Sequence, residues 1–83
     1  MTLISQLTRA GITAREVFKN DDQGNRVPDG CLGYTKHGRK FHIDYADELG
    51  YFHLKIFLDE LEPNDMLSCY CMFKTARKVI EQN

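Results

Sequence analysis

Apolar and polar residues alternate from Gly30 to Leu58 at the period of two that a half-buried β-strand requires. Two turn sequences interrupt this alternation, one at His37-Gly38 and one from Asp47 to Gly50. Each turn contains a glycine, which supplies the positive φ that tight hairpin turns need. The pattern therefore predicts a three-stranded antiparallel meander over residues 30–58.

The two turns also predict the register of this meander. A two-residue turn at His37-Gly38 pairs Lys36 with Arg39 across the strands. The second turn, read as four residues, pairs Ala46 with Tyr51. Both turns place the same apolar set on one face, and a one-residue slip would expose that set along a whole strand. The predicted buried pairs are Tyr34 with Phe41, Leu32 with Ile43, Tyr45 with Phe52, Ile43 with Leu54 and Phe41 with Ile56.

Helices are predicted at both ends of the chain. Thr2 is a good N-cap for a short helix that runs through about Ala10, and Gly11 is suited to end it. Pro63 suits the first turn of a second helix over residues 63–82, which has basic residues in its later turns. The apolar stripe of this second helix comprises Cys69, Phe73, Ala76 and Ile80, with Met66, Met72 and Val79 at its edges.

The segment between the first helix and the meander has a less regular pattern. Residues 13–19 contain two adjacent apolar residues, Val17 and Phe18, so neither the helical nor the strand period fits them cleanly. We predict a strand here, with a continued helix as the alternative, because a strand gives the sheet a fourth member. Residues 20–30 have the composition of a loop and are predicted to form the hairpin connection.

These elements together predict an α+β domain with an N-terminal helix, a four-stranded antiparallel sheet and a C-terminal helix. The sheet combines the meander of residues 30–58 with the strand of residues 13–19, and both helices are predicted to cover its apolar face. The other face is left open. Its two large aromatic residues are Tyr51 and Phe57, which are the type of side chain that carries most of the energy in protein interfaces. We therefore predict a partner-binding surface formed by Tyr51, Phe57, His42, His53, Lys40 and Lys55.

A second surface is predicted on the outer side of the C-terminal helix. Leu67, Tyr70 and Cys71 lie away from its core stripe, which makes the first half of that helix apolar nearly all round. A helix of this kind usually has a second neighbour. We therefore predict that these three residues form a homodimer face.

Composition limits the classes of function. Eighty-three residues form one small domain, and the formal net charge of -1 gives no electrostatic case for nucleic acid or an anionic membrane. The chain has three cysteines without the spacing of a disulfide framework and no apolar run of the roughly 20 residues that a membrane span needs. A cytoplasmic location is predicted on these grounds.

Two groups of residues resemble chemical sites without meeting their requirements. The predicted register places Cys31, Asp44 and His53 in one row, with Cys31 and His53 roughly 9.6 Å apart, too far for a nucleophile and its base. The same row lies on an open surface without the supporting contacts of a zinc site. Cys69 and Cys71, on a helix, would point to nearly opposite sides and could not bind one ion. We therefore predict no metal, no cofactor and no enzymatic activity.

The leading hypothesis is a small non-enzymatic protein that binds another protein, as a regulator or inhibitor of a larger protein machine. Its size and lack of catalytic motifs are typical of proteins that phages and mobile elements encode. The alternative is a nucleic-acid-binding regulator. A helix-turn-helix over Leu3 to Phe18 would support that alternative, but the third packing helix that such a motif needs does not follow. A metal-binding protein and a small enzyme are ranked below both.

Overall fold

The structure is a computed structural model that describes residues 1–83, and it is an α+β fold. Along the chain, one helix precedes the five strands and a second helix follows them. The elements are α1 (Leu3–Arg9), β1 (Ala14–Asn20), β2 (Arg26–Tyr34), β3 (Lys40–Ile43), β4 (Phe52–Phe57), β5 (Met66–Cys71) and α2 (Phe73–Gln82). Neither helix has the length and apolar composition needed to cross a membrane.

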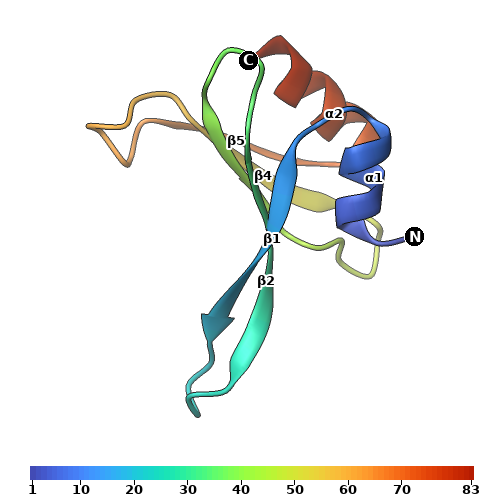
Figure 1. The fold of residues 1–83 in the computed structure, drawn as a ribbon, viewed down its shortest axis with the longest axis vertical. Helices are drawn as coiled ribbons and strands as arrows, with labels where there is room; N and C mark the ends of the chain where they lie inside the picture. The colour runs from blue at the N-terminus through green and yellow to red at the C-terminus, as the bar shows by residue number, and fades with distance from the viewer.

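The five strands form one antiparallel sheet in the order β1-β2-β3-β4-β5, so each strand pairs with its neighbours in the chain. Both helices lie on the same side of this sheet, α1 next to β1 and β2, and α2 next to β4 and β5 (Figure 1). The expectation that the terminal helices share one face is confirmed. We call the other side of the sheet the open face.

The first helix begins and ends as its sequence predicts. The Thr2 side chain accepts a hydrogen bond from the backbone N–H of Ser5, which satisfies one of the free donors at the start of α1. Gly11 has a φ of 77° and follows the C-cap residue Ala10, so the chain turns there towards β1. The strand predicted at residues 13–19 is confirmed as β1.

Three hairpin loops share one construction. The loops span residues 21–25, 35–39 and 47–51, and in each the first and last residues are joined by a backbone hydrogen bond. In each, a glycine in fourth place has a positive φ and donates its N–H to the carbonyl of the first residue. The first residue is Asp or Thr, and its side-chain oxygen accepts a backbone N–H from within the loop. This repeated turn sets the register of three of the four strand pairs.

The β1–β2 hairpin is longer than the rest of the sheet and changes direction halfway along. Between the pairs Glu16–Cys31 and Phe18–Pro28, one residue of β1 lies opposite two residues of β2, Asp29 and Gly30, which is a β-bulge. Gly30 occupies this bulge with a φ of 80°, and a Cβ at this position would overlap the carbonyl oxygen of Ile43. Beyond the bulge, residues 17–29 project away from the sheet as an arm (Figure 1).

The core lies between the sheet and the two helices. Leu3 and Leu7 enter it from α1, and Ala76 and Ile80 enter it from α2. The remaining buried apolar residues are Ile12, Cys31, Phe41, Ile43, Phe52, Leu54, Ile56 and Cys71. The predicted β3–β4 pairs, Phe41 with Ile56 and Ile43 with Leu54, are confirmed.

The predicted register between β2 and β3 is wrong by one residue. Gly33 pairs with Phe41 and Cys31 pairs with Ile43, because the turn contains three residues between Thr35 and Arg39 rather than two. Leu32 and Tyr34 therefore point to the open face, where Tyr34 is 58% exposed. Tyr45, also predicted to be buried, is 40% exposed because it lies outside the β3 and β4 ladder.

The predicted helix over residues 63–82 is wrong in its first half. Residues 66–71 form the strand β5, which pairs with β4 in an unbroken register from Phe52–Cys71 to Phe57–Met66. Pro63 and Asp65 belong to the connecting loop, where the N–H of Asp65 donates to the carbonyl of Glu62. The sheet consequently has five strands instead of four, and β5 rather than the meander forms its second edge.

Candidate functional site: the open face and the β5 edge

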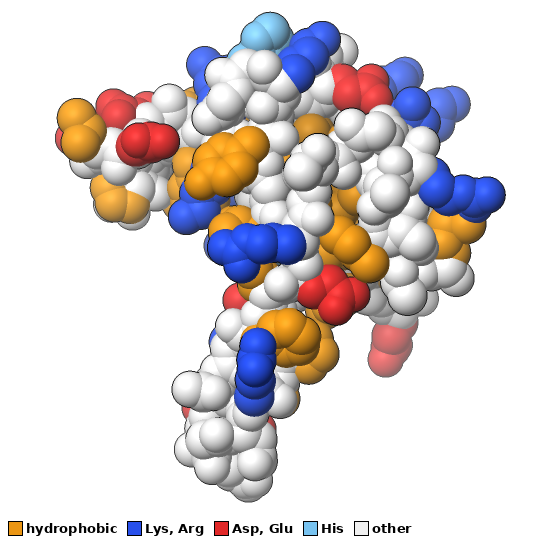
Figure 2. Space-filling view, in the orientation of Figure 1, with side chains coloured by type: hydrophobic (Ala, Val, Ile, Leu, Met, Phe, Trp, Pro, Cys, Tyr) orange, Lys and Arg blue, Asp and Glu red, His pale blue; other side chains and the backbone are white.

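The open face of the sheet carries aromatic and basic side chains in cross-strand rows. One row crosses all five strands, and another joins Tyr34, Lys40 and Phe57 at one end of the meander, where the Lys40 ammonium lies 5.7 Å from the centre of the Phe57 ring. The residues of the first row are Arg15, Leu32, His42, Lys55 and Ser68. In Figure 2 hydrophobic and basic side chains gather where the molecular outline turns inward, between the arm and the loop of residues 58–65.

Three aromatic rings meet where β4 and β5 pair, at the end of this face nearest the turn of residues 47–51. The rings of Tyr51 and Tyr70 have centroids 5.1 Å apart, and those of His53 and Tyr70 are 4.5 Å apart. His53 and Tyr70 are directly paired across the strands. We call these three residues the aromatic cluster. Tyr51 and Tyr70 remain 36% and 45% exposed, so the cluster presents ring surface to solvent.

Asp47 holds the aromatic cluster in place. Its Oδ1 accepts the backbone N–H groups of Leu49 and Tyr51, at 2.9 and 3.0 Å, and its Oδ2 accepts the phenol O–H of Tyr70. The Tyr70 hydrogen bond, followed by those from the backbone, lowers the pKa of the Asp47 carboxyl below its usual value. The same bond raises the pKa of the Tyr70 phenol. A hairpin turn and a side chain of the edge strand are thus joined through one carboxylate.

The backbone edge of β5 adjoins the cluster. β5 pairs with β4 on one side and has no strand on the other, so half of its backbone groups face outward. Its sequence, Met-Leu-Ser-Cys-Tyr-Cys, has no charged residue and no proline, and its register has no bulge. These are the features by which natural sheets usually block an edge, and β5 has none of them.

The six residues predicted to bind a partner all lie on the open face, but they form two groups. Tyr51 and His53 belong to the aromatic cluster, whereas Lys40 and Phe57 lie at the opposite end of β4. His42 and Lys55 are paired with each other in the middle of the sheet. The face therefore has an aromatic end and a mixed basic and aromatic end.

The three residues predicted as a dimer face do not share one surface. Tyr70 points to the open face, whereas Leu67 and Cys71 lie opposite Ile56 and Phe52 on the helix-covered side. Cys71 is 8% exposed and belongs to the core. The prediction was wrong because it assumed helical spacing, under which Tyr70 could not meet Tyr51. Alternation of Leu67, Cys69 and Cys71 at period two is a signal for a strand, in which Tyr70 points to the opposite face from these three residues.

Only part of the predicted row of Cys31, Asp44 and His53 is formed: the N–H of Asp44 donates to the carbonyl of His53 at 2.9 Å, whereas Cys31 is absent from the row. Cys31 lies fully buried on the opposite face, where burial, and then the Glu16 carboxylate, raise the pKa of its thiol. Such a thiol is a poor nucleophile. The side chain of Asp44 lies beside His42, with its carboxylate 3.8 Å from Nδ1.

His42 is held between two aspartates. Its Nε2 lies 2.6 Å from the carbonyl oxygen of Asp29, which accepts hydrogen bonds only, so Nε2 carries a proton and donates it to that oxygen. The Asp29 carboxylate also lies 3.5 Å from the ammonium of Lys19. The potential ligand atoms of Asp29, His42 and Asp44 lie within 4.8 Å of one another. The Asp29 carbonyl therefore occupies Nε2 of His42. Asp29, His42 and Asp44 together form a polar contact between β2 and β3 beside the bulge of β2.

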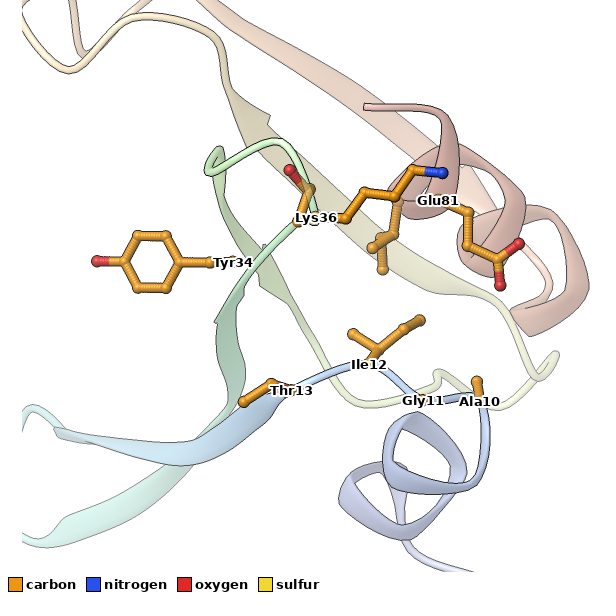
Figure 3. A pocket seen from close by; sticks show the side chains of 9 residues that line it. Ala10, Gly11, Ile12, Thr13, Tyr34, Lys36 and Glu81 are labelled. Atoms are coloured by element: carbon orange, nitrogen blue, oxygen red, sulfur yellow. The ribbon is translucent and has the colours of Figure 1, made fainter.

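A pocket of about 340 Å³ opens between the end of α1, the hairpin of residues 35–39 and the end of α2 (Figure 3). Ile12 and Ile80 line it, and Lys36 extends across it towards the end of α2 that carries Glu81. The Tyr34 ring points away from it. This lining contains no nucleophile with an adjacent base, and so it offers no constellation for covalent catalysis.

Comparisons with models of protein families, with curated proteins and with solved structures found no match for this chain.

Proposed function

We propose that this protein is a non-enzymatic binding protein that attaches to another protein through the aromatic cluster and the adjoining edge of β5. The observation that carries the proposal is the contact of Tyr51, His53 and Tyr70 on the face that no helix covers. In this role it acts as a regulator or inhibitor of a larger protein machine, and a cytoplasmic location is part of the proposal.

The cluster has the properties of an interface anchor. Binding energy at protein interfaces is concentrated in a few large side chains, among which tyrosine is enriched. Tyr70 is held by the Asp47 carboxylate and by two neighbouring rings before any partner arrives. Fixing a free side chain on binding costs about 0.5–1.5 kcal/mol, so an anchor that is already ordered avoids much of that cost.

The β5 edge supplies a second mode of attachment at the same place. An extended segment of a partner gains main-chain hydrogen bonds when it adds to a free sheet edge. Tyr70 is itself a residue of β5, so a segment paired with this strand lies directly against the aromatic cluster. Main-chain pairing then adds to the affinity that the cluster provides, and the cluster also supplies specificity.

The charged residues of the open face fit the outer part of such an interface. Lys55 lies on β4, next to β5, and His42 and Lys40 lie one strand further from the β5 edge, on β3. Charges in this position mainly direct the approach and reject wrong partners, and they add little affinity. The partner surface opposite them is expected to carry acidic groups.

Capture from a lysate of the native host tests the proposal. Tyr70→Ala should remove the captured partner, whereas Phe18→Ala should retain it. Phe18 is a matched control because it is also an aromatic residue of an edge strand and is also 45% exposed, but it lies on β1 at the other edge. Both variants should melt within a few degrees of the wild type, as expected for exposed positions.

Equal loss of capture in both variants would contradict the proposal, and so would full capture by Tyr70→Ala. Phe57→Ala tests whether binding uses the basic end of the open face. If it abolishes capture while Tyr70→Ala does not, the binding site lies at the basic end of the face instead of the cluster.

A nucleic-acid-binding function is the second candidate, and one observation favours it. Arg15, Lys40 and Lys55 share the open face with exposed aromatic rings, which is the composition on which single-stranded nucleic acids stack. Titration with a single-stranded oligonucleotide distinguishes the two functions. Binding that weakens steeply with salt and is lost in Lys55→Ala would favour this second function.

A further inference from the structure

Cys69 and Cys71 lie side by side on the helix-covered face of β5. Residues two apart on a strand point to the same face, which brings the two thiols together in a way that a helix would not. Their Sγ atoms are 3.0 Å apart, and the two thiols share a hydrogen bond. Both cysteines are free thiols in the structure.

We propose that Cys69 and Cys71 are a thiol–disulfide redox site, in which a reversible disulfide forms within a single strand. The short sulfur contact favours this chemistry over metal binding. Two thiolates that share a zinc ion at about 2.3 Å each lie about 3.8 Å apart at the tetrahedral angle, well beyond the observed separation. Closing a covalent bond instead requires the sulfurs to approach by about 1 Å.

The backbone of β5 makes this disulfide easy to reduce. Two residues along an extended strand rise about 6.6 Å, which is near the upper end of the Cα separation that a disulfide spans. The bond therefore forms under tension along the strand. Strained disulfides are the labile ones that cells use for regulation, whereas relaxed ones are structural.

The two thiols have different roles because their surroundings differ. Cys69 is partly exposed, whereas Cys71 belongs to the core. Burial, followed by the hydrogen bond that the two thiols share, raises the pKa of the Cys71 thiol to about 11. Cys69 is therefore the thiol that attacks an oxidant, and Cys71 is the one that resolves the product.

The oxidant is a small-molecule disulfide of the glutathione class. The Cys69 thiolate attacks one of its sulfurs, so that a bond forms between them while the original disulfide bond breaks and one glutathione leaves as a thiolate. Cys71 then loses its proton and attacks the Cys69 sulfur, and the second glutathione leaves. Two cysteine thiols are oxidised and one glutathione disulfide is reduced to two thiols, which take up the two protons released.

Oxidation has a consequence for the open face, and this step rests on the proposed function. Tyr70 is the residue between the two cysteines, and its ring contacts Tyr51 and His53. Drawing Cys69 and Cys71 together shortens the strand on either side of Tyr70 and displaces its ring from the cluster. The oxidised protein should therefore lose its partner, while the reduced protein binds it.

Peptide mapping of the full chain in glutathione buffers of increasing oxidised fraction tests the redox site by itself. Trypsin separates Cys31 from the other two cysteines, because residues 27–36 contain Cys31 and residues 56–74 contain both Cys69 and Cys71. We expect the 56–74 peptide to become lighter by two hydrogen atoms, and to recover in reduced glutathione, while the Cys31 peptide keeps its free thiol. A stable glutathione adduct on Cys69, a disulfide between two chains, or no reaction would each overturn the proposal.

Single variants test the order of attack. Cys71→Ser should accumulate the glutathione adduct on Cys69, because nothing displaces it, and Cys69→Ser should react at least tenfold more slowly than the wild type. Closure in the wild type should accelerate as the pH rises towards the pKa of Cys71. Rapid adduct formation on Cys71 in Cys69→Ser would contradict the assigned roles.

Partner capture under both redox conditions separates this inference from the proposed function. If the disulfide forms and near-ultraviolet circular dichroism of the tyrosines changes, but no partner is captured in either state, the proposed function fails and the redox site stands. If a partner is captured equally in both states while the disulfide forms, the coupling through Tyr70 is wrong.

Discussion

The two edges of the sheet differ in almost every property that controls whether an edge accepts another strand. The β1 edge carries Arg15, Glu16 and Lys19, its partner strand is bulged at Gly30, and α1 packs beside it. The β5 edge has no charge, no proline and no bulge. Charges and bulges are the usual means by which proteins prevent strand addition. The β1 edge therefore has features that oppose the addition of another strand, and the β5 edge lacks them.

The largest effect is expected from breaking the bulge that turns the β1 edge away. Gly30→Ala places a Cβ against the carbonyl oxygen of Ile43, whereas Gly24→Ala has the same φ of 80° and open space around it. Gly24→Ala should cost about 1–2 kcal/mol for the left-handed backbone, and Gly30→Ala about 3 kcal/mol or more. Urea unfolding of the two variants measures the difference. Equal losses of unfolding free energy in the two variants would show that the close approach of the Ile43 backbone to Gly30 does not constrain the bulge.

A charge placed on the open edge should give the next largest effect. We expect the wild-type chain to self-associate at high micromolar concentration by pairing β5 with β5, which is a different dimer from the one predicted through a helix face. Ser68→Lys should weaken this association at least tenfold, or about 1.4 kcal/mol, because an edge lysine opposes strand pairing. Phe18→Lys, on the already charged β1 edge, is the control and should leave it unchanged. Sedimentation equilibrium gives the result, and a strictly monomeric wild type would contradict homodimerisation.

A smaller effect is expected in the pH dependence of stability, and it comes from the Asp47–Tyr70 hydrogen bond on the β5 side of the sheet. The pKa of Asp47 is lowered and that of Tyr70 is raised by the hydrogen bond between them. Its contribution to stability is therefore present above the usual pKa of Asp, 3.8, and is lost as the pH falls through the lowered value. At the alkaline end it is present below 10.0 and is lost as the pH rises through the raised pKa of Tyr70.

Phenolate absorbance and the tyrosine resonances follow this titration. Asp47→Asn should return Tyr70 towards the behaviour of an ordinary tyrosine, because the negative acceptor is removed. Asp21→Asn alters the equivalent residue of the first hairpin loop and should leave Tyr70 unchanged. A Tyr70 titration that is the same in all three proteins would mean that the carboxylate does not hold the cluster.

The smallest effect is expected on the arm of the β1 side. The Arg26 guanidinium lies 4.4 Å from the centre of the Phe18 ring, in a cation–π contact that is exposed to solvent. Such contacts contribute about 0.5–1 kcal/mol at exposed sites. Arg26→Ala and Phe18→Ala should each cost about this amount, and the double variant no more than either alone. Additive costs in this double-mutant cycle would show that the two side chains act independently.

Turn chemistry accounts for both the correct and the incorrect parts of the predicted meander. The β3–β4 register was predictable because Asp47 to Gly50 reads clearly as a turn, and residues 44–46 absorb the one-residue difference between the predicted and observed loops. Between β2 and β3 no unpaired residues separate the loop from the paired strands, so a change of one residue in the loop shifts the whole register. There the Thr35 side chain accepts the N–H of Arg39, which adds one residue to the loop and exchanges the two faces of β2.

Residues 66–71 show where sequence pattern is insufficient. Cys69, Phe73 and Ala76 follow helical spacing, yet the first of these lies on a strand, because pairing with β4 satisfies its backbone better than an isolated helical turn. That pairing is a long-range contact, which local periodicity does not encode. The aromatic cluster depends on it, so Tyr51 and His53 were predictable as surface residues of the open face and Tyr70 as their neighbour was not.

The strictly sequential strand order also has a kinetic consequence. Every strand pairs with the strands that precede and follow it in the chain, and three of the four connections are tight loops or close to it. Assembly therefore needs no closure of a long loop, whose entropy is the usual cause of slow folding in β proteins. Each hairpin forms locally and the next strand adds to it, so we expect folding on the order of milliseconds, with β5 and α2 docking onto a sheet that is already in place.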